Sequence, residues 1–338
     1  MDRRTFLQLA ATGLAFSGPA FGLRARADRA PSLGGIGYQL SWIKNFQFAG
    51  EYIAESRKYY QKFGLQVDLL GGGPSISADP IVASGRVLIG QSSPENTANA
   101  VEHGAALKCI GAQYQKILFC IISLSKSGLL TPKDMIGRKI GIQTANLVVW
   151  RSFLKLNKID PASVQVVPVQ FDLSPLIEGA VEGFFGYAND DFVQVKAKGY
   201  DVRAMLFADF GYKMFTGIYV VATDSLTDKT KRAQLVAFMK GDIMGWQDAL
   251  KDPTLGANLT VEVYGKGNGL DLGIQEAACR ASNWYMTSPD TDKHGLLWMG
   301  PTAIEDTIAT LSAAGVKAAP DMFTTEILEE AYGGRNTI

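Results

Sequence analysis

The sequence contains few of the residues that usually carry out catalysis or bind metals. Among its 338 residues are only two histidines, His103 and His294, and three cysteines, Cys109, Cys120 and Cys279. The histidines are far apart in the chain, and the cysteines lack the spacing of metal ligands. There is no G-x-S-x-G elbow, H-E-x-x-H pair, C-x-x-C pair, P-loop lysine or EF-hand loop. We therefore predict that the protein is not an enzyme and has no catalytic residues, cofactor or bound metal.

Neither sign of charge is in excess. Lysine and arginine together number 33, as do aspartate and glutamate, so there is no basic field that would hold nucleic acid. Hydrophobic residues make up 47% and charged residues 20% of the chain, which is typical of a folded globular protein. At about 150 residues per domain, the length predicts two domains.

The odd number of cysteines allows at most one disulfide. Cys109 and Cys120 are the local candidates for a pair in an oxidising compartment. Residues 117–124 are nearly all apolar, however, and this favours buried free thiols.

Residues 1–27 have the three parts of an export signal in the expected order. Arg3-Arg4 begins a twin-arginine pattern, residues 9–21 are mildly apolar, and Ala25-Arg26-Ala27 is a small-x-small cleavage site. The apolar part is too short to span a membrane. Cleavage would leave 29 basic and 32 acidic residues, a net charge near −3. We expect a soluble mature protein outside the cytoplasm, in the periplasm.

Residues 36–75 predict a strand, a helix and a second strand joined by polar loops. The strands are expected at 36–40 and 66–70, with a helix from Asn45, a good N-cap, to Phe63. In a βαβ unit, ligands bind beyond the carboxyl ends of the strands. We expect the residues after both strands to bind the ligand, namely Trp42, Asn45, Gln47, Phe48, Glu51, Gly72 and Gly73.

A third junction of the same kind follows a predicted strand at 86–90. Ser92 and Ser93 lie at the start of the next helix, where backbone N–H groups are free to bind a carbonyl, carboxylate or sulfonate. For each serine alone, simple helix capping explains the pattern equally well.

The alternation of strands and helices continues in the second half. A buried strand at 117–124 leads into it, and strands are predicted at 139–142, 164–169 and 183–187. Residues 225–338 are mainly helical by periodicity, and we expect them to pack on the first lobe. The loops after the strands add the candidate ligand-binding residues Gln143, Asn146, Tyr187, Asn189 and Asp190.

Three segments resemble a known family. Residues 42–54 read W-x-x-N-x-Q-F-A-G-x-Y-x-A, and a Gly-Gly-Pro loop follows at 72–74. Residues 131–141, T-P-K-D-M-I-G-R-K-I-G, are similar to the entry into the second lobe of that family, T-P-K-D-L-x-G-K-K-I-G. The family is that of the substrate-binding proteins of ABC importers for nitrate, taurine, sulfonates and thiamine-type pyrimidines.

The resemblance implies an α/β fold of two lobes, the type II periplasmic binding protein fold, with the ligand cleft between the lobes. We expect lobe 1 to comprise residues 28–116 plus 223–338 and lobe 2 to comprise residues 117–222. The implied partners are a small-molecule solute and a membrane permease with its ATPase. A monomer is expected, and no nucleic acid.

The residues of the predicted cleft favour a flat, nitrogen-bearing ring. Lys44 and Arg151 are the cations near the cleft loops, and they are outnumbered by acidic and aromatic residues. The pyrimidine-binding relatives close the second lobe with G-Y-x-x-N-[EQ]. Residues 186–190 here read G-Y-A-N-D, with the shorter acid Asp190. We expect Trp42 and Tyr187 to stack on the ring, Asn45 and Gln47 to orient it, and Asp190 to accept a hydrogen bond.

Two alternatives remain open at this point. The ligand can be a sulfonate, taurine or nitrate in place of a thiamine-precursor pyrimidine. The chain also resembles the fungal thiamine-pyrimidine synthases, which are enzymes with a cysteine cluster and a reactive histidine near the cleft. Isolated cysteines and the absence of histidine from the cleft loops make an enzyme the less favoured interpretation.

The N-terminal pattern generates a test of export. Replacing Arg3 and Arg4 together by lysine keeps both charges but removes the twin-arginine signal, so export through that route is expected to stop. Fractionation of cells that express the two forms measures this. Unaltered export of the double variant would indicate the general secretory route instead.

Overall fold

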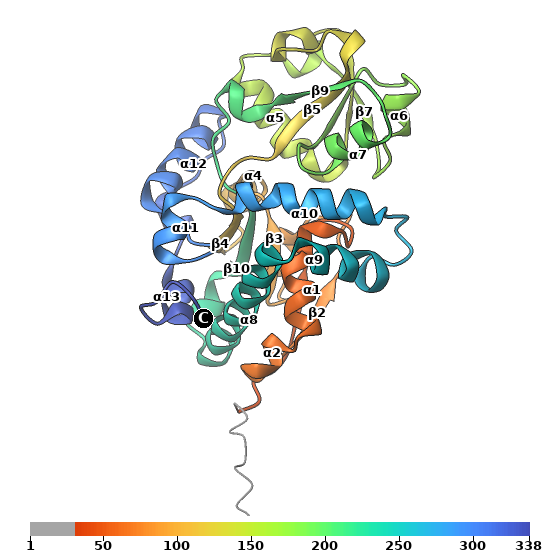
Figure 1. The fold of residues 1–338 in the computed structure, drawn as a ribbon. Helices are drawn as coiled ribbons and strands as arrows, with labels where there is room; N and C mark the ends of the chain where they lie inside the picture. Colours follow the sequence, from red (N-terminus) through yellow and green to blue (C-terminus); the bar gives the residue numbers. More distant parts are fainter. Residues whose placement is uncertain (1–30) are drawn as a thin grey trace, which may run out of the picture.

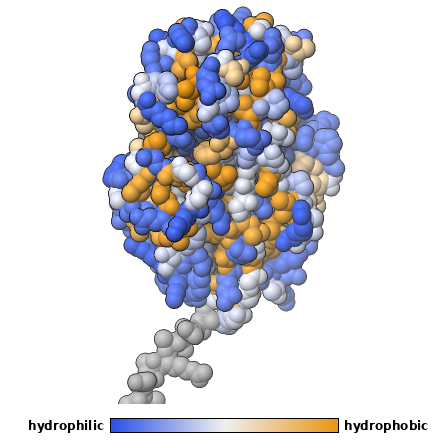
Figure 2. Space-filling view, turned by 90° about the vertical axis from the view of Figure 1, so that its right-hand side faces the viewer, coloured by the Kyte–Doolittle hydropathy of each residue, from blue (hydrophilic) through white to orange (hydrophobic). Residues whose placement is uncertain are grey.

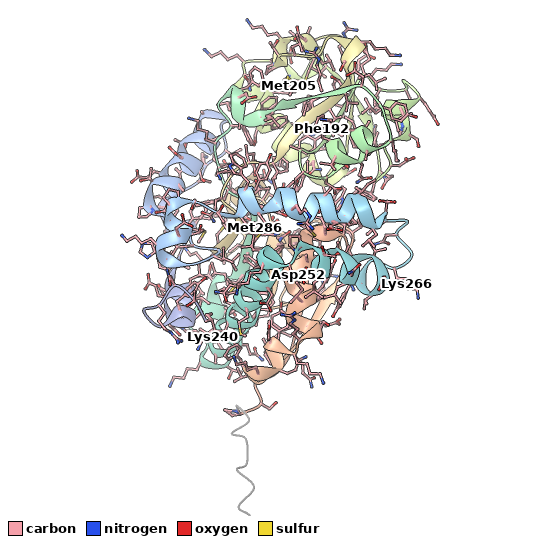
Figure 3. The ribbon with its side chains drawn as sticks, viewed as in Figure 1. Phe192, Met205, Lys240, Asp252, Lys266 and Met286 are labelled. Carbon is pink, nitrogen blue, oxygen red and sulfur yellow. The ribbon has the colours of Figure 1, made fainter. Side chains whose placement is uncertain are left out.

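The computed structural model describes residues 31–338, which form two α/β lobes (Figure 1). The predicted export signal at residues 1–27 lies outside the described residues. In Figure 3, Phe192 and Met205 lie in the second lobe, and Lys240 and Asp252 lie in the first. Each lobe is built on one five-stranded sheet. The predicted two-lobed α/β fold is therefore confirmed.

The first sheet contains parallel and antiparallel strands. The first two strands in the chain pair in parallel, as predicted for a βαβ unit, and the last strand runs antiparallel to both of its neighbours. In spatial order the strands are β2 (Leu65–Leu70), β1 (Gly34–Gln39), β3 (Ile89–Ser92), β10 (Thr216–Ala222) and β4 (Leu107–Tyr114).

The helix predicted from Asn45 to Phe63 is wrong in one respect, because three shorter elements replace it. They are the 3-10 turn η1 (Phe46–Phe48) and the helices α1 (Ala49–Ser56) and α2 (Tyr59–Lys62). Lys58 separates the two helices with a φ of 59°, in the left-handed region. Periodicity continues across this break and therefore does not reveal it.

Helices cover both faces of the first sheet. Helix α1 lies so close to α8 that a Cβ on Gly245 would be 2.1 Å from the Gly50 carbonyl oxygen, so the contact requires glycine there. The other helices of this part of the chain are α3 (Ala78–Ala83), α4 (Pro94–Glu102), α8 (Lys229–Lys251), α9 (Pro253–Leu259), α10 (Leu272–Met286), α11 (Pro289–His294), α12 (Pro301–Ala313) and α13 (Glu326–Tyr332).

The second sheet contains the strands predicted for the second half of the chain. In spatial order these are β7 (Gln165–Pro168), β6 (Lys139–Ile142), β8 (Gly183–Tyr187), β5 (Phe119–Leu124) and β9 (Val202–Leu206). The predicted bounds of β6 and β8 match the structure, and β5 is almost entirely buried, as predicted. The helices beside this sheet are α5 (Leu147–Leu156), α6 (Ser174–Ile177) and α7 (Asp191–Ala197).

Two features bear on the expected lobe boundaries. Strand β10 ends at Ala222 but pairs within the first sheet, so the chain returns to that sheet before residue 223. Helix α12 contacts α5, and its Leu311 belongs to the same apolar core as Phe153 of α5. The C-terminal helices thus pack on both lobes. We propose that the return crossing lies between β9 and β10.

The cysteine thiols lie inside the protein, and hydrophilic residues lie on its surface. Cys109, Cys120 and Cys279 are buried free thiols, as predicted. Hydrophilic residues are spread over both lobes, with smaller hydrophobic groups between them (Figure 2). Within residues 31–338, none of the helices combines the length and the apolarity needed to cross a membrane.

The core of the first lobe contains two buried carboxyl groups beside tyrosines. Asp242 of α8 accepts hydrogen bonds from the hydroxyls of Tyr60 (2.9 Å) and Tyr219 (2.6 Å). Glu51 of α1 accepts one from Tyr38 at 3.4 Å. Both carboxyl groups are inaccessible to solvent. Burial raises the pKa of Asp242 to about 7 and, together with the nearby Asp242, raises the pKa of Glu51 well above its usual value.

The raised pKa of Asp242 makes folding depend on pH. Because the folded protein holds this proton more tightly than the unfolded chain, the stabilisation is complete below about pH 4 and is lost as the pH rises towards about 7. Asp242→Asn, which mimics the protonated form, is expected to flatten this loss. One carboxyl changes the free energy of unfolding by at most about 1.4 kcal/mol per pH unit. Urea unfolding between pH 5 and 8 measures the difference.

Asp248→Asn is the matched control, because Asp248 lies on the same helix but is partly exposed and pairs with Arg57. The Asp248→Asn variant is expected to show the same change in the free energy of unfolding with pH as the wild type. The same pH slope in the wild type and in Asp242→Asn would contradict the assignment.

Candidate functional site

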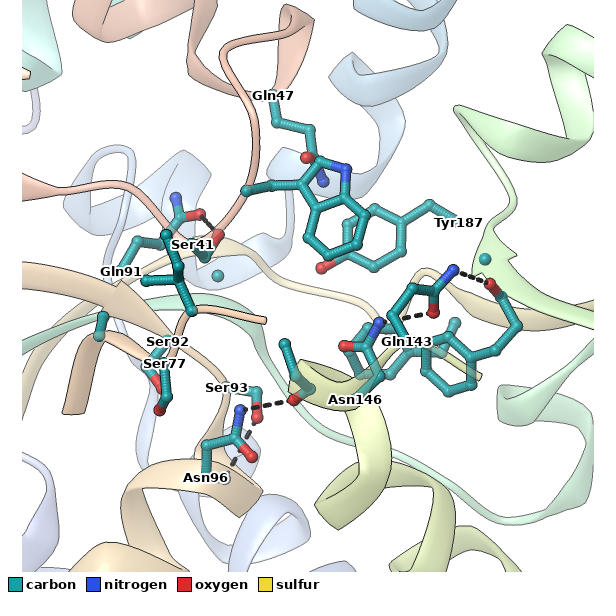
Figure 4. A pocket seen from close by; sticks show the side chains of 18 of the residues that line it. Ser41, Gln47, Ser77, Gln91, Ser92, Ser93, Asn96, Gln143, Asn146 and Tyr187 are labelled. Atoms are coloured by element: carbon teal, nitrogen blue, oxygen red, sulfur yellow. Dashed lines mark hydrogen bonds between the residues drawn. The ribbon is translucent and has the colours of Figure 1, made fainter. Parts of the chain in front are cut away.

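A cavity lies between the two lobes and opens to solvent (Figure 4). The carboxyl ends of β1 and β3 border it from the first lobe, and those of β6 and β8 border it from the second. The cavity is therefore at the edge of the sheets where a ligand was expected.

The wall from the first lobe carries hydroxyl and amide groups. Ser41 and Trp42 follow β1, and Gln91 and Ser92 end β3. Ser93 is the N-cap of α4, and its Oγ accepts a hydrogen bond from the Asn96 backbone N–H at 3.2 Å. In Figure 4 the labelled residues Ser41, Ser77, Gln91 and Ser92 group on one side of the cavity.

The wall from the second lobe combines amides with aromatic rings. Gln143 donates to the Phe185 carbonyl at 3.0 Å and accepts from Asn146 at 3.0 Å. The rings of Phe119 and Tyr187 pack with their centroids 5.2 Å apart. Trp42 of the first lobe contacts Phe171 of the second edge to face, at 6.2 Å. The cavity thus has aromatic rings on both sides.

Two neighbouring carboxyl groups border the cavity on the second lobe. Asp190 accepts from Asn45 (3.0 Å) and Gln194 (2.7 Å), and Asp191 accepts from the Tyr187 backbone N–H (2.9 Å). A Cβ on Gly186 would be 2.5 Å from the Asp191 carboxylate, so glycine makes room for this bond. Burial, and then the charge of Asp191, raise the pKa of Asp190 well above its usual value. Burial raises the pKa of Asp191 to about 6.

Four hydrogen bonds join the lobes around the cavity, and one of them runs from Asn96 Nδ2 of the first lobe to the Ala145 carbonyl of the second at 3.4 Å. Asn45 Nδ2 donates to Asp190 Oδ2 at 3.0 Å, and Asn189 Nδ2 donates to Ser282 Oγ at 2.8 Å. The backbone N–H of Ala145 donates to the Pro74 carbonyl at 2.9 Å. The structure is therefore a closed arrangement of the two lobes.

Eight of the fourteen predicted residues line the cavity. They are Trp42, Gln47, Ser92, Ser93, Gln143, Asn146, Tyr187 and Asp190. Two others, Asn45 and Asn189, do not line it but form the hydrogen bonds between the lobes described above.

The other four residues do not border this cavity. Phe48 and Glu51 are inaccessible to solvent in the core of the first lobe, where the Phe48 ring packs edge to face against Tyr52 and Glu51 accepts a hydrogen bond from Tyr38. Gly72 and Gly73 lie behind the Trp42 loop. The Gly72 N–H donates to the Trp42 carbonyl at 2.9 Å, and a Cβ there would be 2.3 Å from the Leu40 oxygen. Gly72 thus holds that loop, and neither glycine lines the cavity.

The sequence interpretation did not select several residues that line the cavity. Ser41, Gln91 and Asp191 are each next to a selected residue, and the pattern of strands and loops could have included them. Ser77 and Asn96 lie three or four positions from the nearest selected residue, and Phe119 lies at the start of a strand in which every residue reads as core. The missed side chains include Ser41, Ser77, Gln91, Asn96, Phe119 and Asp191.

The lining contains neither lysine nor arginine among residues 31–338. Lys44 and Arg151, the cations expected near the cleft, do not border it. In the same range, no group of three or more histidine, cysteine, aspartate or glutamate side chains could hold a metal ion. The site therefore offers aromatic rings, hydroxyls, amides and two carboxyl groups.

A family model described as NMT1/THI5 like matches residues 45–255. The riboflavin-binding protein RibY of Chloroflexus aurantiacus is 24% identical over 309 residues, covering 88% of this chain and 87% of that protein. A putative thiamine biosynthesis protein of Haemophilus influenzae is 24% identical over 207 residues, covering 60% of this chain and 66% of that protein.

A solved structure shares the fold. The alkanesulfonate-binding protein SsuA from Xanthomonas axonopodis pv. citri, bound to MOPS, superposes with a TM-score of 0.63 at 16% identity. The match covers 87% of this chain and 97% of the other. At this identity the similarity concerns the fold alone.

The bond between Asn45 and Asp190 generates a test of closure. Asn45→Asp keeps the cap on the Gln47 N–H (3.1 Å) but places an acceptor against the Asp190 carboxyl, so the lobes are expected to separate. Small-angle X-ray scattering is expected to show a larger radius of gyration than for the wild type.

Gln194→Glu is the matched control. It also replaces an amide that donates to Asp190 by a carboxyl group, but Gln194 and Asp190 both belong to the second lobe. Each variant is expected to lose about 1 to 3 kcal/mol of stability. Only the variant at the junction of the lobes is expected to change the scattering. Equal radii for the two variants would show that this bond does not hold the lobes together.

Proposed function

The chain belongs to the NMT1/THI5-like family, and from this premise we propose that it is the solute-binding component of an ABC importer. The cavity between its lobes captures a small heteroaromatic solute. A ligand that touches both lobes stabilises their closed arrangement, because only that arrangement offers all of its contacts. A membrane permease and its ATPase are the partners in this proposal, and the protein acts as a monomer in the periplasm.

The observation that carries this proposal is the chemistry of the cavity wall. Nitrate and sulfonates are anions that accept hydrogen bonds, and arginine is the usual side chain for binding them. This wall has no lysine or arginine among the described residues, and it has two carboxyl groups, the buried one of Asp190 and the partly buried one of Asp191. Those groups disfavour an anion and suit an uncharged or amino-bearing ring.

The aromatic residues indicate how a ring is held. Trp42 comes from the first lobe and Tyr187 from the second, so a planar solute between them contacts both. Each such aromatic pair contributes about 0.5 to 1.5 kcal/mol beyond the burial of its area. Gln47 orients the ring, and Asp190 accepts a hydrogen bond from an amino or ring N–H group. Asn45 acts on the ligand only through Asp190.

A thiamine-precursor pyrimidine is the solute we favour, and riboflavin is the larger candidate of the same class. The relatives support heteroaromatic solutes, since one is named riboflavin-binding and another a putative thiamine biosynthesis protein. A sulfonate, taurine or nitrate is the alternative, which the fold of the alkanesulfonate-binding protein also accommodates.

An enzyme of the pyrimidine-synthase kind is the less favoured alternative. Cys109, Cys120 and Cys279 are buried and do not line the cavity. His103 bonds the Asn99 carbonyl through its Nδ1, and His294 stacks on Trp298, so neither ring reaches the cavity. These positions favour binding over chemistry. Iron bound to the purified protein would favour the enzyme.

Isothermal titration calorimetry tests the ligand class. We expect 4-amino-5-hydroxymethyl-2-methylpyrimidine or riboflavin to bind, and nitrate, taurine and an aryl sulfonate to give no heat of binding. Trp42→Ala is expected to weaken binding of the ring about 3- to 10-fold through lost stacking. Trp284→Ala is the matched control, since Trp284 is 63% exposed and does not line this cavity. Binding of an anion alone would overturn the proposal.

A further inference from the structure

The hydroxyl group of Ser92 borders the cavity but points its hydrogen away from it. Ser92 Oγ donates to the carboxylate of Asp79 at 2.5 Å, and Thr97 Oγ1 donates to the other oxygen of that carboxylate at 2.6 Å. Ser77 Oγ makes a longer bond to Asp79 at 3.4 Å. Asp79 is buried and does not line the cavity. Burial raises the pKa of Asp79, and the hydrogen bonds from Ser92 and Thr97 oppose that shift by stabilising the ionised form. The ionised carboxylate can only accept hydrogen bonds, so the Ser92 hydroxyl must donate to it and presents its lone pairs to the cavity.

Ser41 is oriented in the same way by a chain of glutamine amides. The Gln47 backbone carbonyl accepts from Gln113 Nε2 at 2.7 Å, so Gln113 turns its oxygen towards Gln91 Nε2, which donates to it. Gln91 then turns its own oxygen towards Ser41, whose hydroxyl donates at 2.6 Å. A carbonyl cannot donate, so it fixes the direction of the whole chain. Ser41 therefore also presents lone pairs to the cavity.

Glycine makes room for this chain of amides. Gly217 has a φ of 66°, and a Cβ there would be 3.2 Å from Gln113 Oε1 and 3.5 Å from Gln91 Nε2. A side chain at this position would be strained and would press on the bond between the two glutamines. Gln113, like Asp79, is buried and outside the lining.

The asparagines that border the cavity follow the same rule. Asn146 Nδ2 donates to Gln143, which is itself fixed by the Phe185 carbonyl, and Asn96 Nδ2 donates to the Ala145 carbonyl at 3.4 Å. Each keeps its side-chain oxygen free. The Oε1 atom of Gln47, a residue only 5% exposed, has no hydrogen-bond partner among residues 31–338. A buried acceptor without a partner is costly unless a ligand supplies the donor.

From these directions we propose that the cavity selects solutes that donate hydrogen bonds to the first lobe, such as rings with an amino or imino edge. Asp79 is a positioning residue that sets this selectivity without touching the solute. The inference rests on the proposed function and adds the hydrogen-bonding character of the ligand to it. Solutes that only accept hydrogen bonds, or that are apolar at this edge, leave several oxygens of the wall unpaired.

A pair of probes of nearly the same shape tests the selectivity in the wild type. 4-Amino-2-methylpyrimidine carries a donor group, and in 2,4-dimethylpyrimidine a methyl group replaces that amino group. Calorimetry is expected to show about 10- to 100-fold tighter binding of the amino compound. The dimethyl compound lacks the amino group and therefore leaves buried acceptors of the wall unpaired. Equal affinities would overturn the inference but leave the proposed function standing. If neither probe bound, nor riboflavin, both would fall.

A pair of variants tests the role of Asp79. Thr97→Val is the control, because it removes one donor to Asp79 and leaves Ser92 donating. In the double variant Thr97→Val, Asp79→Asn, the new amide at position 79 has an NH2 group that needs an acceptor. The valine at position 97 has no acceptor, so the NH2 group donates to the Ser92 hydroxyl oxygen. The Ser92 hydroxyl then turns its hydrogen towards the cavity. We expect the control to keep the ratio of the two probe affinities and the double variant to reduce it to near 1.

This readout separates a positioning role from a structural one. Damage to the fold would weaken both probes together and leave the ratio of affinities unchanged, whereas a turned hydroxyl changes the ratio. Thermal melting of both variants establishes that they are folded. The wild-type ratio in a folded double variant would overturn the role of Asp79. If the double variant did not fold, the ratio measured on the wild type would still decide whether the cavity selects donors.

Discussion

Polar groups buried where the two lobes meet need hydrogen-bond partners, and several of them find one in the opposite lobe. Asn45 and Asp190 satisfy each other across the gap, as do Asn189 and Ser282. Were the lobes to separate, water would have to replace every one of these partners. Asn45 follows β1 of the first sheet, Asn189 and Asp190 follow β8 of the second, and Ser282 lies on α10. Closure therefore assembles the cavity wall from parts that are far apart in the sequence.

Local pattern was enough to predict most of the strands, whereas the resemblance to a known family implied the arrangement in two lobes. The bounds of β6 and β8 followed from short apolar runs between helix signals, and the parallel pairing of β1 with β2 followed from the intervening helix. The break at Lys58 could not be predicted, because a single residue with positive φ leaves the apolar periodicity intact. Nor does periodicity say which lobe a late helix covers, and α12 packs against α5 of the second lobe.

The candidate site was predicted in outline for a similar reason. Parallel strands place the loops after them at one edge, and that rule selected eight residues that line the cavity. It failed for Glu51 because a position one turn into a helix faces the core or the cleft according to the angle at which the helix leaves the loop. It failed for Gly72 because a glycine can serve the backbone of a neighbouring loop, here that of Trp42. Both outcomes depend on three-dimensional contacts that spacing does not contain.

Two pairs of carboxyl groups show why burial alone does not identify a binding site. Asp242 and Glu51 are buried beside tyrosines in the core of the first lobe. Asp190 is buried between the lobes, where it accepts a hydrogen bond from Asn45, and its neighbour Asp191 is partly buried. Burial raises the pKa values of both pairs. Only the second pair borders a cavity, so only there can a solute take up the remaining capacity to accept hydrogen bonds. The functional difference between the two pairs is the space beside them, and that space exists because the closing lobes meet around it.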